Sequence, residues 1–373
     1  MVDQQEILSA IALSQLKGVG LADLPRVCQT LGSASAVFEH RGHLSDVLPD
    51  ASPRLLQALG HADDAWQRAE QEVAFMEGKS IRCIPFADAD YPQRLWECSD
   101  APLALFYCGN ADLNRRHVVS VVGTRRCTSY GRDVCHQFME ELRQADPEVM
   151  VVSGLAYGID ICAHREALAC GMDTVAVLAH GLDRVYPSLH RDTAVKMTHQ
   201  GGLLTEFLSG TGPEKRNFVQ RNRIVAGLSD VTIVVESAER GGSLITASIA
   251  HSYQRDVVAF PGRVYDEHSK GCNRIIQNEL ARPIRSAEDL FRIMAWKPRA
   301  QTGKAVQQEL FVELTEDERR LCDCLKEADT LSVGQLVAAT GLSVSGVGVT
   351  LFELEAKGVV DRLGGTRYKL LRR

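Results

Sequence analysis

The chain has 373 residues, 45% hydrophobic and 24% charged, with a net charge of −6, which predicts a soluble globular protein of two or three domains. No apolar run approaches the roughly 18–20 residues of a membrane span, and the opening MVDQQEILSA lacks the basic region of a signal peptide, so we expect no membrane association and a cytoplasmic location. The eleven cysteines include no CxxC pair or adjacent histidine cluster, which favours buried thiols over disulfides or a zinc site.

Residues 1–75 are expected to form an accessory helical domain. Apolar residues recur at helical spacing on both sides of Gly18-Val19-Gly20. This arrangement resembles a SAM-like or helix-hairpin-helix module, in which hairpin glycines let backbone amides approach a DNA phosphate. A small packing module with ordinary glycine caps explains the pattern equally well, because only Lys17 lies near the turn. Both interpretations remain open at this point.

Residues 76–295 are expected to form an extended, Rossmann-like α/β domain. SIRCIPF and PLALFYCG predict short strands that extend a sheet, and from His117 onward β-branched runs alternate with helical segments. This alternation is typical of a doubly wound, mostly parallel sheet. Strands are predicted at 118–122, 149–154, 174–179, 201–206, 231–236 and 256–262, and helices at 132–145, 161–169, 189–199, from about 218, and from about 243 to 253.

Three of the predicted strands end in the loops GTRR, SGLAYG and ERGGS. The carboxyl ends of parallel strands meet at one edge of a sheet, where ligands bind, so these distant segments are expected to converge on an anion. The first loop reads GTRRCT in place of GxGxxG, which puts Arg125 where a pyrophosphate would lie. We therefore expect no dinucleotide or other cofactor and no metal, and instead a backbone phosphate bound from outside.

A dense basic stretch precedes the strand at 231–236. Lys215, Arg216, Arg221 and Arg223 place four cations in nine residues of an acidic chain, and Phe218 lies among them. A helix start favours phosphate, and an exposed ring can stack a base, worth roughly 1–3 kcal/mol. The alternative is that the ring belongs to the core and the arginines form a solvated face.

Eight motifs, in this order, resemble the DNA-processing protein A (DprA/Smf) family over residues 80–290: VVGTRR with TSYG, SGLAYGID, GGLLTEF, FVQRNRIVAGLS, VVES, GGSLITA, AFPG and SKGCNRII. The resemblance implies a non-enzymatic protein that binds single-stranded DNA, protects incoming strands and loads the recombinase RecA during natural transformation. It also implies a homodimer formed through the sheet domain, with single-strand-binding protein as a further candidate partner.

The expected DNA-binding residues combine the residue patterns with this resemblance. Arg125, Lys215, Arg221 and Arg223 would neutralise phosphates while Phe218 stacks a base, although Arg223 could instead be a buried partner of a carboxylate. The full set is Gly123, Thr124, Arg125, Ser153, Gly154, Lys215, Phe218, Arg221, Asn222, Arg223, Gly241, Gly242 and Ser243.

Residues 296–312 are expected to be a linker, and residues 313–373 a winged helix. Thr315 followed by Glu318 predicts a helix start, a helix-turn-helix follows, and a hairpin is expected to turn at Gly364-Gly365. The candidate recognition helix has no Arg or Lys before Lys357, which argues against sequence-specific duplex binding. Its apolar face is expected to be mostly core, with a protein-contact surface as the alternative: Val344, Val347, Leu351 and Leu354.

Two other functions compete with strand binding. The sheet with its GGSLIT helix start resembles, more weakly, nucleotide phosphoribohydrolases, for which Glu206 or Glu236 would be the acid or base. Either glutamate is more simply a buried cap, and no second glutamate follows GGS closely, as that chemistry would need. A winged-helix transcription regulator with a ligand-sensing sheet is opposed by the neutral recognition helix.

Overall fold

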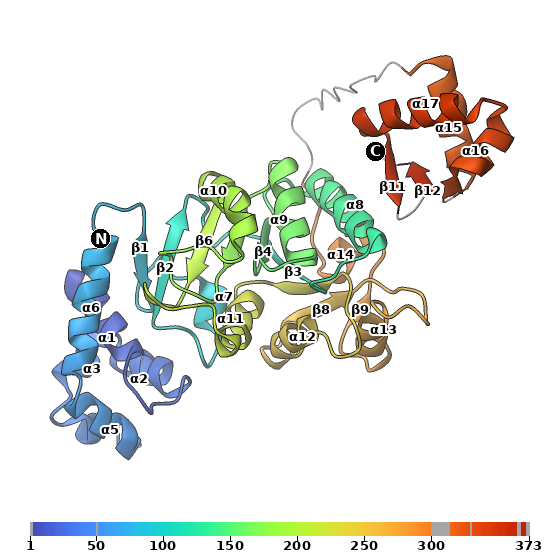
Figure 1. The fold of residues 1–373 in the computed structure, drawn as a ribbon. Coiled ribbons are helices and arrows are strands. Elements are labelled where there is room, and N and C mark those ends of the chain that lie inside the picture. Colours follow the sequence, from blue (N-terminus) through green and yellow to red (C-terminus); the bar gives the residue numbers. More distant parts are fainter. Residues whose placement is uncertain (1–2, 50, 300–313, 329, 364–366, 371–373) are drawn as a thin grey trace. The chain divides into compact units, whose positions relative to one another are not determined.

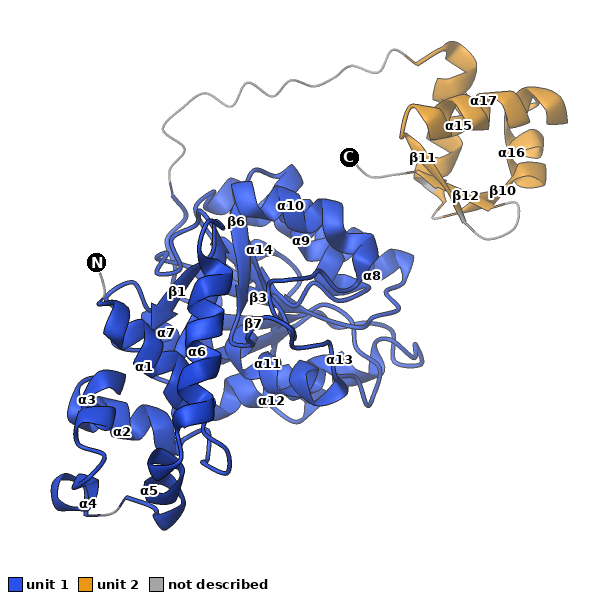
Figure 2. Ribbon diagram, turned by 60° about the vertical axis from the view of Figure 1, so that its left-hand side comes forward, with its two compact units in different colours: residues 1–300 blue, residues 301–373 orange. Residues whose placement is uncertain are grey.

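The computed structural model describes residues 3–49, 51–299, 314–328, 330–363 and 367–370. The chain divides into two compact units, residues 1–300 and 301–373, which are coloured separately in Figure 2. Each unit has a hydrophobic core of its own.

The described part of residues 1–75 is helical, as the apolar spacing predicts, and contains six helices. Gly18 lies in the turn between the first two with a positive φ of 79°, so the chain reverses there through a conformation that glycine adopts readily. The helices are α1 (Gln4–Ser14), α2 (Asp23–Leu31), α3 (Ala34–Glu39), α4 (Leu44–Val47), α5 (Pro53–Gly60) and α6 (Asp63–Met76).

The described residues then form a nine-stranded sheet in the order β1-β2-β6-β5-β4-β3-β7-β8-β9 (Figure 1). Strands β3 to β9 pair in parallel, whereas β2 pairs antiparallel with β1 and β6. The doubly wound, mostly parallel sheet is therefore confirmed, and so is its extension by the two early strands. The bounds are β1 (Arg82–Pro85), β2 (Ala104–Gly109), β3 (Val118–Val122), β4 (Met150–Ser153), β5 (Thr174–Val177), β6 (Gly201–Thr205), β7 (Val231–Val234), β8 (Asp256–Ala259) and β9 (Arg282–Pro283).

Helices cover both faces of this sheet (Figure 1). Along β3, Val119 and Val121 pack into a core with α8, α9 and α14, whereas Val118 and Val122 pack into the core shared with α11 and α12. A buried strand must be apolar on both faces, which explains its β-branched run. The helices are α7 (Gln93–Trp96), α8 (Ser129–Ala145), α9 (Ile159–Ala169), α10 (Arg191–His199), α11 (Lys215–Gly227), α12 (Ser243–Ser252), α13 (Lys270–Gln277) and α14 (Ala287–Ile293), with a 3₁₀ turn, η1, at Ser188–His190.

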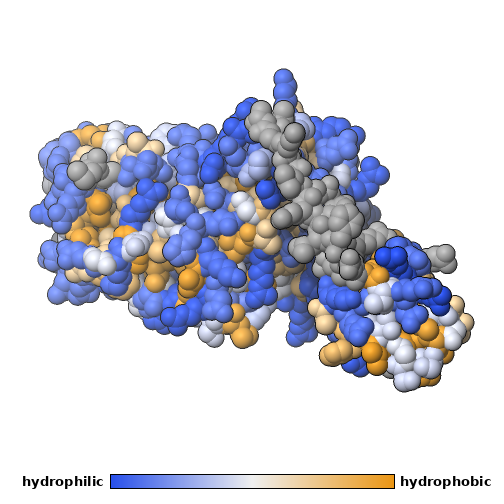
Figure 3. All heavy atoms as spheres, turned by 90° about the horizontal axis from the view of Figure 1, so that it is seen from above, coloured by the Kyte–Doolittle hydropathy of each residue, from blue (hydrophilic) through white to orange (hydrophobic). Residues whose placement is uncertain are grey.

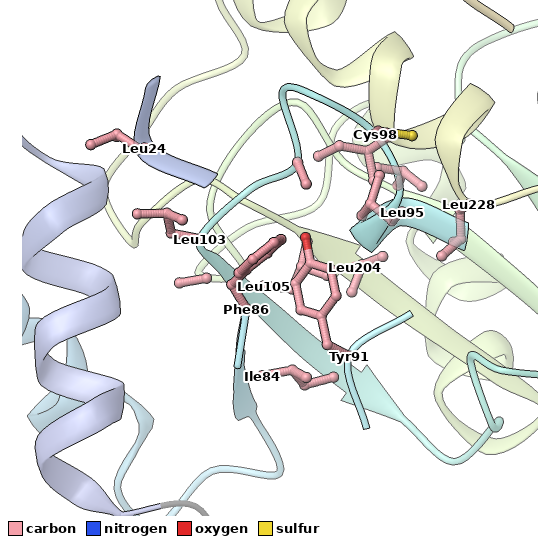
Figure 4. Packing of buried hydrophobic residues seen from close by; sticks show 14 of the residues in the cluster. Leu24, Ile84, Phe86, Tyr91, Leu95, Cys98, Leu103, Leu105, Leu204 and Leu228 are labelled. Atoms are coloured by element: carbon pink, nitrogen blue, oxygen red, sulfur yellow. The ribbon is translucent and has the colours of Figure 1, made fainter. Parts of the chain in front are cut away.

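The N-terminal helices share a core with the antiparallel end of the sheet. Figure 4 shows Leu24 of α2 beside Leu103 and Phe86, in the cluster that continues to Leu204 of β6. Buried apolar area of this kind resists separation of the two parts. The boundary expected at residue 75 stays a prediction, since these segments form one hydrophobic cluster.

The second unit has the winged-helix fold predicted from the sequence. Thr315 and Glu318 form the expected capping box at the start of its first helix. The hairpin expected at Gly364-Gly365 and most of the expected linker lie outside the described residues. The elements are α15 (Glu316–Glu327), β10 (Leu331–Ser332), α16 (Val333–Thr340), α17 (Val344–Ala356), β11 (Val360–Leu363) and β12 (Arg367–Leu370), and the strand order is β10-β12-β11.

One residue expected in the core of this unit is exposed. Val347, Leu351 and Leu354 are buried on α17, but Val344 is 66% exposed because it begins the helix before the first core position. On the face drawn in Figure 3, hydrophilic residues predominate and apolar residues form small, separate groups. Among the described helices, none alone is long and apolar enough to cross a membrane, while the sharply bent pair α16 and α17 meets that test jointly, by length and composition only.

Candidate nucleic-acid interface

The candidate interface lies where the order of the parallel strands reverses. From β3 the chain moves to β4, β5 and β6 on one side, and then returns to place β7 and β8 on the other side. The loops at the carboxyl ends of β3 and β7 diverge there, which is the usual ligand position in an open α/β sheet.

Glu236 joins the two diverging loops. Its buried carboxylate accepts hydrogen bonds from the Thr128 amide at 2.9 Å and the Thr128 hydroxyl at 2.5 Å, and its carbonyl accepts one from the Thr124 amide at 2.8 Å. Thr128 in turn caps α8 by accepting from the Gly131 amide. Glu236 is therefore the buried cap that the sequence favoured over an acid or base.

Gly158 fixes the loop that carries Arg125. Gly158 has a positive φ of 79°, and a Cβ at this position would overlap the Thr124 carbonyl oxygen and the Arg125 backbone. The next residue, Ile159, donates its amide to the same carbonyl at 3.1 Å. The loops after β3 and β4 thus converge as expected, and only glycine permits their approach.

Arg125 and Phe218 form the centre of the candidate interface. The exposed Arg125 guanidinium lies 5.2 Å from the centre of the half-buried Phe218 ring, within cation–π range. The Tyr186 ring meets the same ring edge-on at 6.0 Å. The Phe218 ring is thus neither sealed in the core nor free in solvent, and the distant segments that carry it and Arg125 are brought together.

Lys215 is the first residue of α11 and lies three residues before Phe218, close to one helical turn. Its side chain is exposed and makes no hydrogen bond or ion pair with any residue that the structure describes. The neighbouring Arg216 is also exposed, but pairs with Glu214 at 3.0 Å. Asn222 is half-buried and lies about two helical turns after Lys215. Lys215, Phe218, Val219 and Asn222 therefore mark the outward side of the helix.

Two of the predicted phosphate ligands are buried. Arg221 is 3% exposed and donates to the Gly154 carbonyl at 2.7 Å and to the Val177 carbonyl. Arg223 donates to the Asp100 carbonyl and pairs with Glu206. The expectation that these two cations neutralise phosphates is therefore wrong, whereas the alternative of Arg223 as a buried carboxylate partner is confirmed.

Helical period explains the correction. Asn217, Arg221, Ile224 and Leu228 follow one another at spacings of four, three and four, and all four are buried. Arg221 therefore shares the face of α11 that packs toward the sheet with Ile224 and Leu228. Arg221 then closes the carboxyl ends of β4 and β5 from inside.

The predicted serines also turn inward. Ser153 is completely buried and donates to the Val121 carbonyl at 2.6 Å, and Ser243 is buried and donates to the Ser237 hydroxyl at 2.9 Å. A direct ligand contact from either hydroxyl is therefore contradicted. The predicted glycines and Thr124 remain at or near the surface apart from Gly154, which is buried against the Arg221 guanidinium: Gly123, Thr124 and Gly241 are half-buried, and Gly242 is exposed.

Buried charges beneath the interface balance one another. Burial lowers the pKa of Arg221 to about 10, so it stays protonated at neutral pH, and its field partly offsets the burial that raises the pKa of Asp160. Burial also lowers the pKa of His164 to about 3, which keeps that imidazole neutral. Of the four cations predicted to bind phosphates, only Arg125 and Lys215 therefore offer their charge to solvent.

Two aromatic residues were missed by sequence reasoning. Tyr186 follows β5 in a loop without a helical or strand pattern, so nothing local marked it. Tyr157 lies in the SGLAYG loop already singled out, is exposed, and packs edge-on against His190 at 5.1 Å. An aromatic residue in a loop at the carboxyl edge was the available signal.

Models of known families match most of the chain. The model of the DNA recombination-mediator protein A family matches residues 82–295, and that of the DprA winged helix domain matches residues 309–366. The first match covers the whole parallel sheet and its surrounding helices.

Individual relatives agree with the family models. The chain is 30% identical to Protein Smf of Synechocystis sp. over 96% of this chain and 97% of the relative, and 41% identical to DNA processing protein DprA of Streptococcus pneumoniae over 54% and 71%. The solved structure of the Streptococcus pneumoniae protein superimposes with a TM-score of 0.64 at 32% identity, over 78% of this chain and 98% of that one. A structure of DNA processing protein A from Helicobacter pylori, described by its single-stranded DNA binding mode, matches with a TM-score of 0.52 at 27% identity, over 58% and 95%.

Proposed function

Because the chain belongs to the DNA recombination-mediator protein A (DprA) family, we propose that it binds single-stranded DNA across the carboxyl edge of its sheet, without catalysing a reaction on it. The observation that supports this most strongly is the pairing of an exposed guanidinium, Arg125, with an accessible ring, Phe218, from segments 93 residues apart in the sequence (218 − 125). The two groups match the two parts of a nucleotide, its phosphate and its base.

Arg125 and Lys215 supply the phosphate contacts in this proposal. Neither side chain forms a salt bridge within the described ranges, so a bound phosphate does not have to displace a paired carboxylate. Each phosphate contact releases counterions, which makes binding weaken steeply with salt. The positive charge of this site is a local feature, because the chain as a whole carries a net charge of −6.

Phe218 supplies the contact that favours an unpaired strand. A base stacks on a ring through its flat face, which a duplex leaves covered by neighbouring base pairs. Stacking accepts any base, so binding is expected to be largely indifferent to sequence. Tyr186 packs edge-on against the Phe218 ring and limits how that ring can turn.

We extend the proposal to the role that the family resemblance implies. The protein would act in the cytoplasm as a homodimer formed through the sheet domain, protect incoming strands together with single-strand-binding protein, and load RecA during natural transformation. The name DNA processing protein for relatives from Streptococcus pneumoniae and Bacillus subtilis is consistent with such a role, as is the strand-binding description of the Helicobacter pylori protein.

A direct binding experiment tests the core of the proposal. Fluorescence anisotropy of a labelled oligothymidine would be measured with the wild-type protein, Arg125→Ala and Lys215→Ala over a range of salt concentrations. Each substitution should weaken binding and lower the magnitude of the salt slope by about 1. Unchanged affinity and slope in both variants would remove the assignment.

A second experiment tests the recombinase role separately. RecA filament assembly would be followed on oligothymidine coated with single-strand-binding protein, with and without this protein. We expect faster assembly with the wild type and no acceleration with Arg125→Ala. If the wild type binds the strand but leaves assembly unchanged, strand binding stands and recombinase loading is contradicted.

A further inference from the structure

We propose that the bound strand continues from Arg125 along the sheet edge to the β8–α13 loop, residues 260–269, where Tyr265 stacks a second base and Arg263 contacts a phosphate. This inference rests on the proposed function, because it extends the same strand. It adds a second aromatic contact, at the tip of the loop, residues 263–268, which lies between the motifs AFPG and SKGCNRII and outside the expected binding set.

The sheet places this loop on the same edge as Arg125. Strands β3, β7 and β8 are consecutive neighbours and all run parallel, so the chain leaves each of them at the same edge. Two strand spacings amount to about 10 Å. With a rise of about 3.4 Å per stacked nucleotide, roughly three nucleotides cover that interval.

Hydrogen bonds hold the base of the loop in place. Asn273 of α13 accepts from the Gly262 amide and donates to the Gly262 carbonyl, both at 3.1 Å. The Ser237 amide, just after β7, donates to the His268 carbonyl at 2.8 Å. The Tyr130 hydroxyl, in the first turn of α8, donates to the Pro261 carbonyl at 3.0 Å and so ties this loop to the element that follows Arg125.

The tip of the loop presents an aromatic ring to solvent. Tyr265 is 95% exposed and Val264 is 73% exposed, and the Tyr265 ring packs against no other aromatic ring among the residues described. A large ring this exposed contributes nothing to the core, so the fold gives no reason for it. A ring on a fixed base at an edge that already carries a stacking residue provides the second base platform.

Cations bridge the interval between the two rings. Arg126, Arg240 and Arg263 are exposed, and their side chains form no ion pair or hydrogen bond with any other part of the chain that the structure describes. The nearby acidic groups are Glu239, Asp266, which accepts from the His268 amide at 3.2 Å, and Glu267, which pairs with Lys270 at 3.5 Å. With Arg125, this edge therefore carries four exposed arginines and three carboxylates, one of which is already paired with Lys270. The local excess of positive charge contrasts with the net charge of −6 of the whole chain.

Oligonucleotide length separates this inference from the proposed function. Anisotropy would be measured with oligothymidines of about 2 nucleotides, too short to cover the interval, and of about 20 nucleotides. The proteins are the wild type, Arg125→Ala, Tyr265→Ala, Arg263→Ala and the control Val264→Ala, which alters an exposed neighbour on the same loop. Tyr265→Ala should weaken binding of the long strand roughly 5- to 150-fold, corresponding to one stacked base at 1–3 kcal/mol, and leave the short strand unchanged. Arg263→Ala should lower the salt slope by about 1 for the long strand alone.

The outcomes divide cleanly. If Arg125→Ala weakens both strands and Tyr265→Ala weakens neither, or weakens both equally, the extended path is wrong and the proposed function stands. If neither Arg125→Ala nor Tyr265→Ala changes binding, the proposed function itself fails. Tyr265→Trp gives an independent readout, because its fluorescence should be quenched by the long strand and not by the short one; equal quenching, or none, would overturn the path.

Discussion

The Phe218 ring is positioned by three side chains, two from loops and one from its own helix, α11. Arg125 stands over it, Arg221 lies 6.0 Å from its centre from the buried side, and Tyr186 meets it edge-on. The two cations favour an electron-rich ring face and fix its orientation before any ligand arrives. A ring held in this way loses little further entropy when a base stacks on it.

This arrangement predicts a large effect of Phe218→Ala on strand affinity. Loss of one stacked base should weaken oligothymidine binding by about 1–3 kcal/mol, or roughly 5- to 150-fold, while Phe218→Tyr should retain most of the affinity. Val219→Ala, which trims the exposed neighbour, is the matched control. Equal affinities for wild type and Phe218→Ala would show that no base stacks there.

Substitution of Arg221 should lower the stability of the protein, whereas substitution of Lys215 should not. Arg221→Ala leaves the Gly154 and Val177 carbonyls without their guanidinium donor, at a cost of about 1–3 kcal/mol for each unsatisfied buried group. The free energy of unfolding measured in urea should therefore fall for Arg221→Ala. For Lys215→Ala it should stay within about 0.5 kcal/mol, as is usual at an exposed position. Stability unchanged in Arg221→Ala would contradict the buried role.

His164 gives the protein a dependence of stability on pH. Its folded-state pKa is about 3, because burial disfavours the charged ring, whereas an unfolded histidine titrates near 6.5. Between these values the unfolded chain binds the proton and the folded chain does not. Stability should therefore be full above about pH 6.5 and fall as the pH drops toward 3.

The measurement is the urea unfolding free energy at several pH values for the wild type and His164→Asn. The amide of Asn can replace the ring nitrogen that bonds to Thr174 at 2.7 Å. His164→Asn should show a shallower decline below pH 6.5. Parallel curves for the two proteins would assign the pH dependence to other groups.

At the scale of elements, glycines in the loops after β3 and β4 set the position of Arg125. Gly158 is the tightest of these, since its positive φ coincides with contact against the Thr124 carbonyl and the Arg125 backbone. Gly158→Ala should displace the Arg125 loop and weaken strand binding. Gly171 has a similar φ of 72° with open space around it, so Gly171→Ala should cost stability alone.

Comparing oligothymidine anisotropy and urea unfolding of these two variants separates backbone strain from loop displacement. Both should lose stability, and only Gly158→Ala should also lose affinity at temperatures where both remain folded. If Gly171→Ala lowers affinity as much, the effect comes from general destabilisation rather than from the loop.

Much of the sheet could be predicted from the sequence, because its strands are apolar on both faces and separated by helices of ordinary length. The convergence of GTRR and SGLAYG followed from the rule for parallel strands, and that of ERGGS stays a prediction. The orientation of Arg221, Arg223, Ser153 and Ser243 could not be predicted in this way. A polar residue near a strand end can face a ligand or satisfy a buried carbonyl, and only the packing of segments distant in sequence decides which.

Other features carried too little local signal. β9 has two residues, and the short α14 lies beyond the last clear strand, so neither showed a period. Tyr186 and Tyr265 are single aromatic residues in loops. Whether such a residue lies at the binding surface depends on which distant ring or loop packs beside it, which the local sequence does not show. Glu236 shows the converse, because a buried cap was the simpler interpretation of a carboxylate at a strand end and the structure confirms it.

At the scale of the whole molecule, the two units have separate hydrophobic cores. The Streptococcus pneumoniae structure matches 78% of this chain over 98% of its own length. We expect residues 1–300 to fold alone and bind oligothymidine within about threefold of the full chain. A larger loss measured by anisotropy would show that residues 301–373 contribute to the strand site.

Strand binding at the carboxyl edge of the sheet requires that the protein prefer unpaired DNA to duplex DNA. The most direct measurement is competition for a labelled oligothymidine by unlabelled single-stranded and duplex DNA of equal length at moderate salt, with the wild type and Phe218→Ala. The wild type should be displaced far more readily by the single strand, and Phe218→Ala should lose most of that preference. Equal competition by duplex and single strand with the wild type would contradict the account.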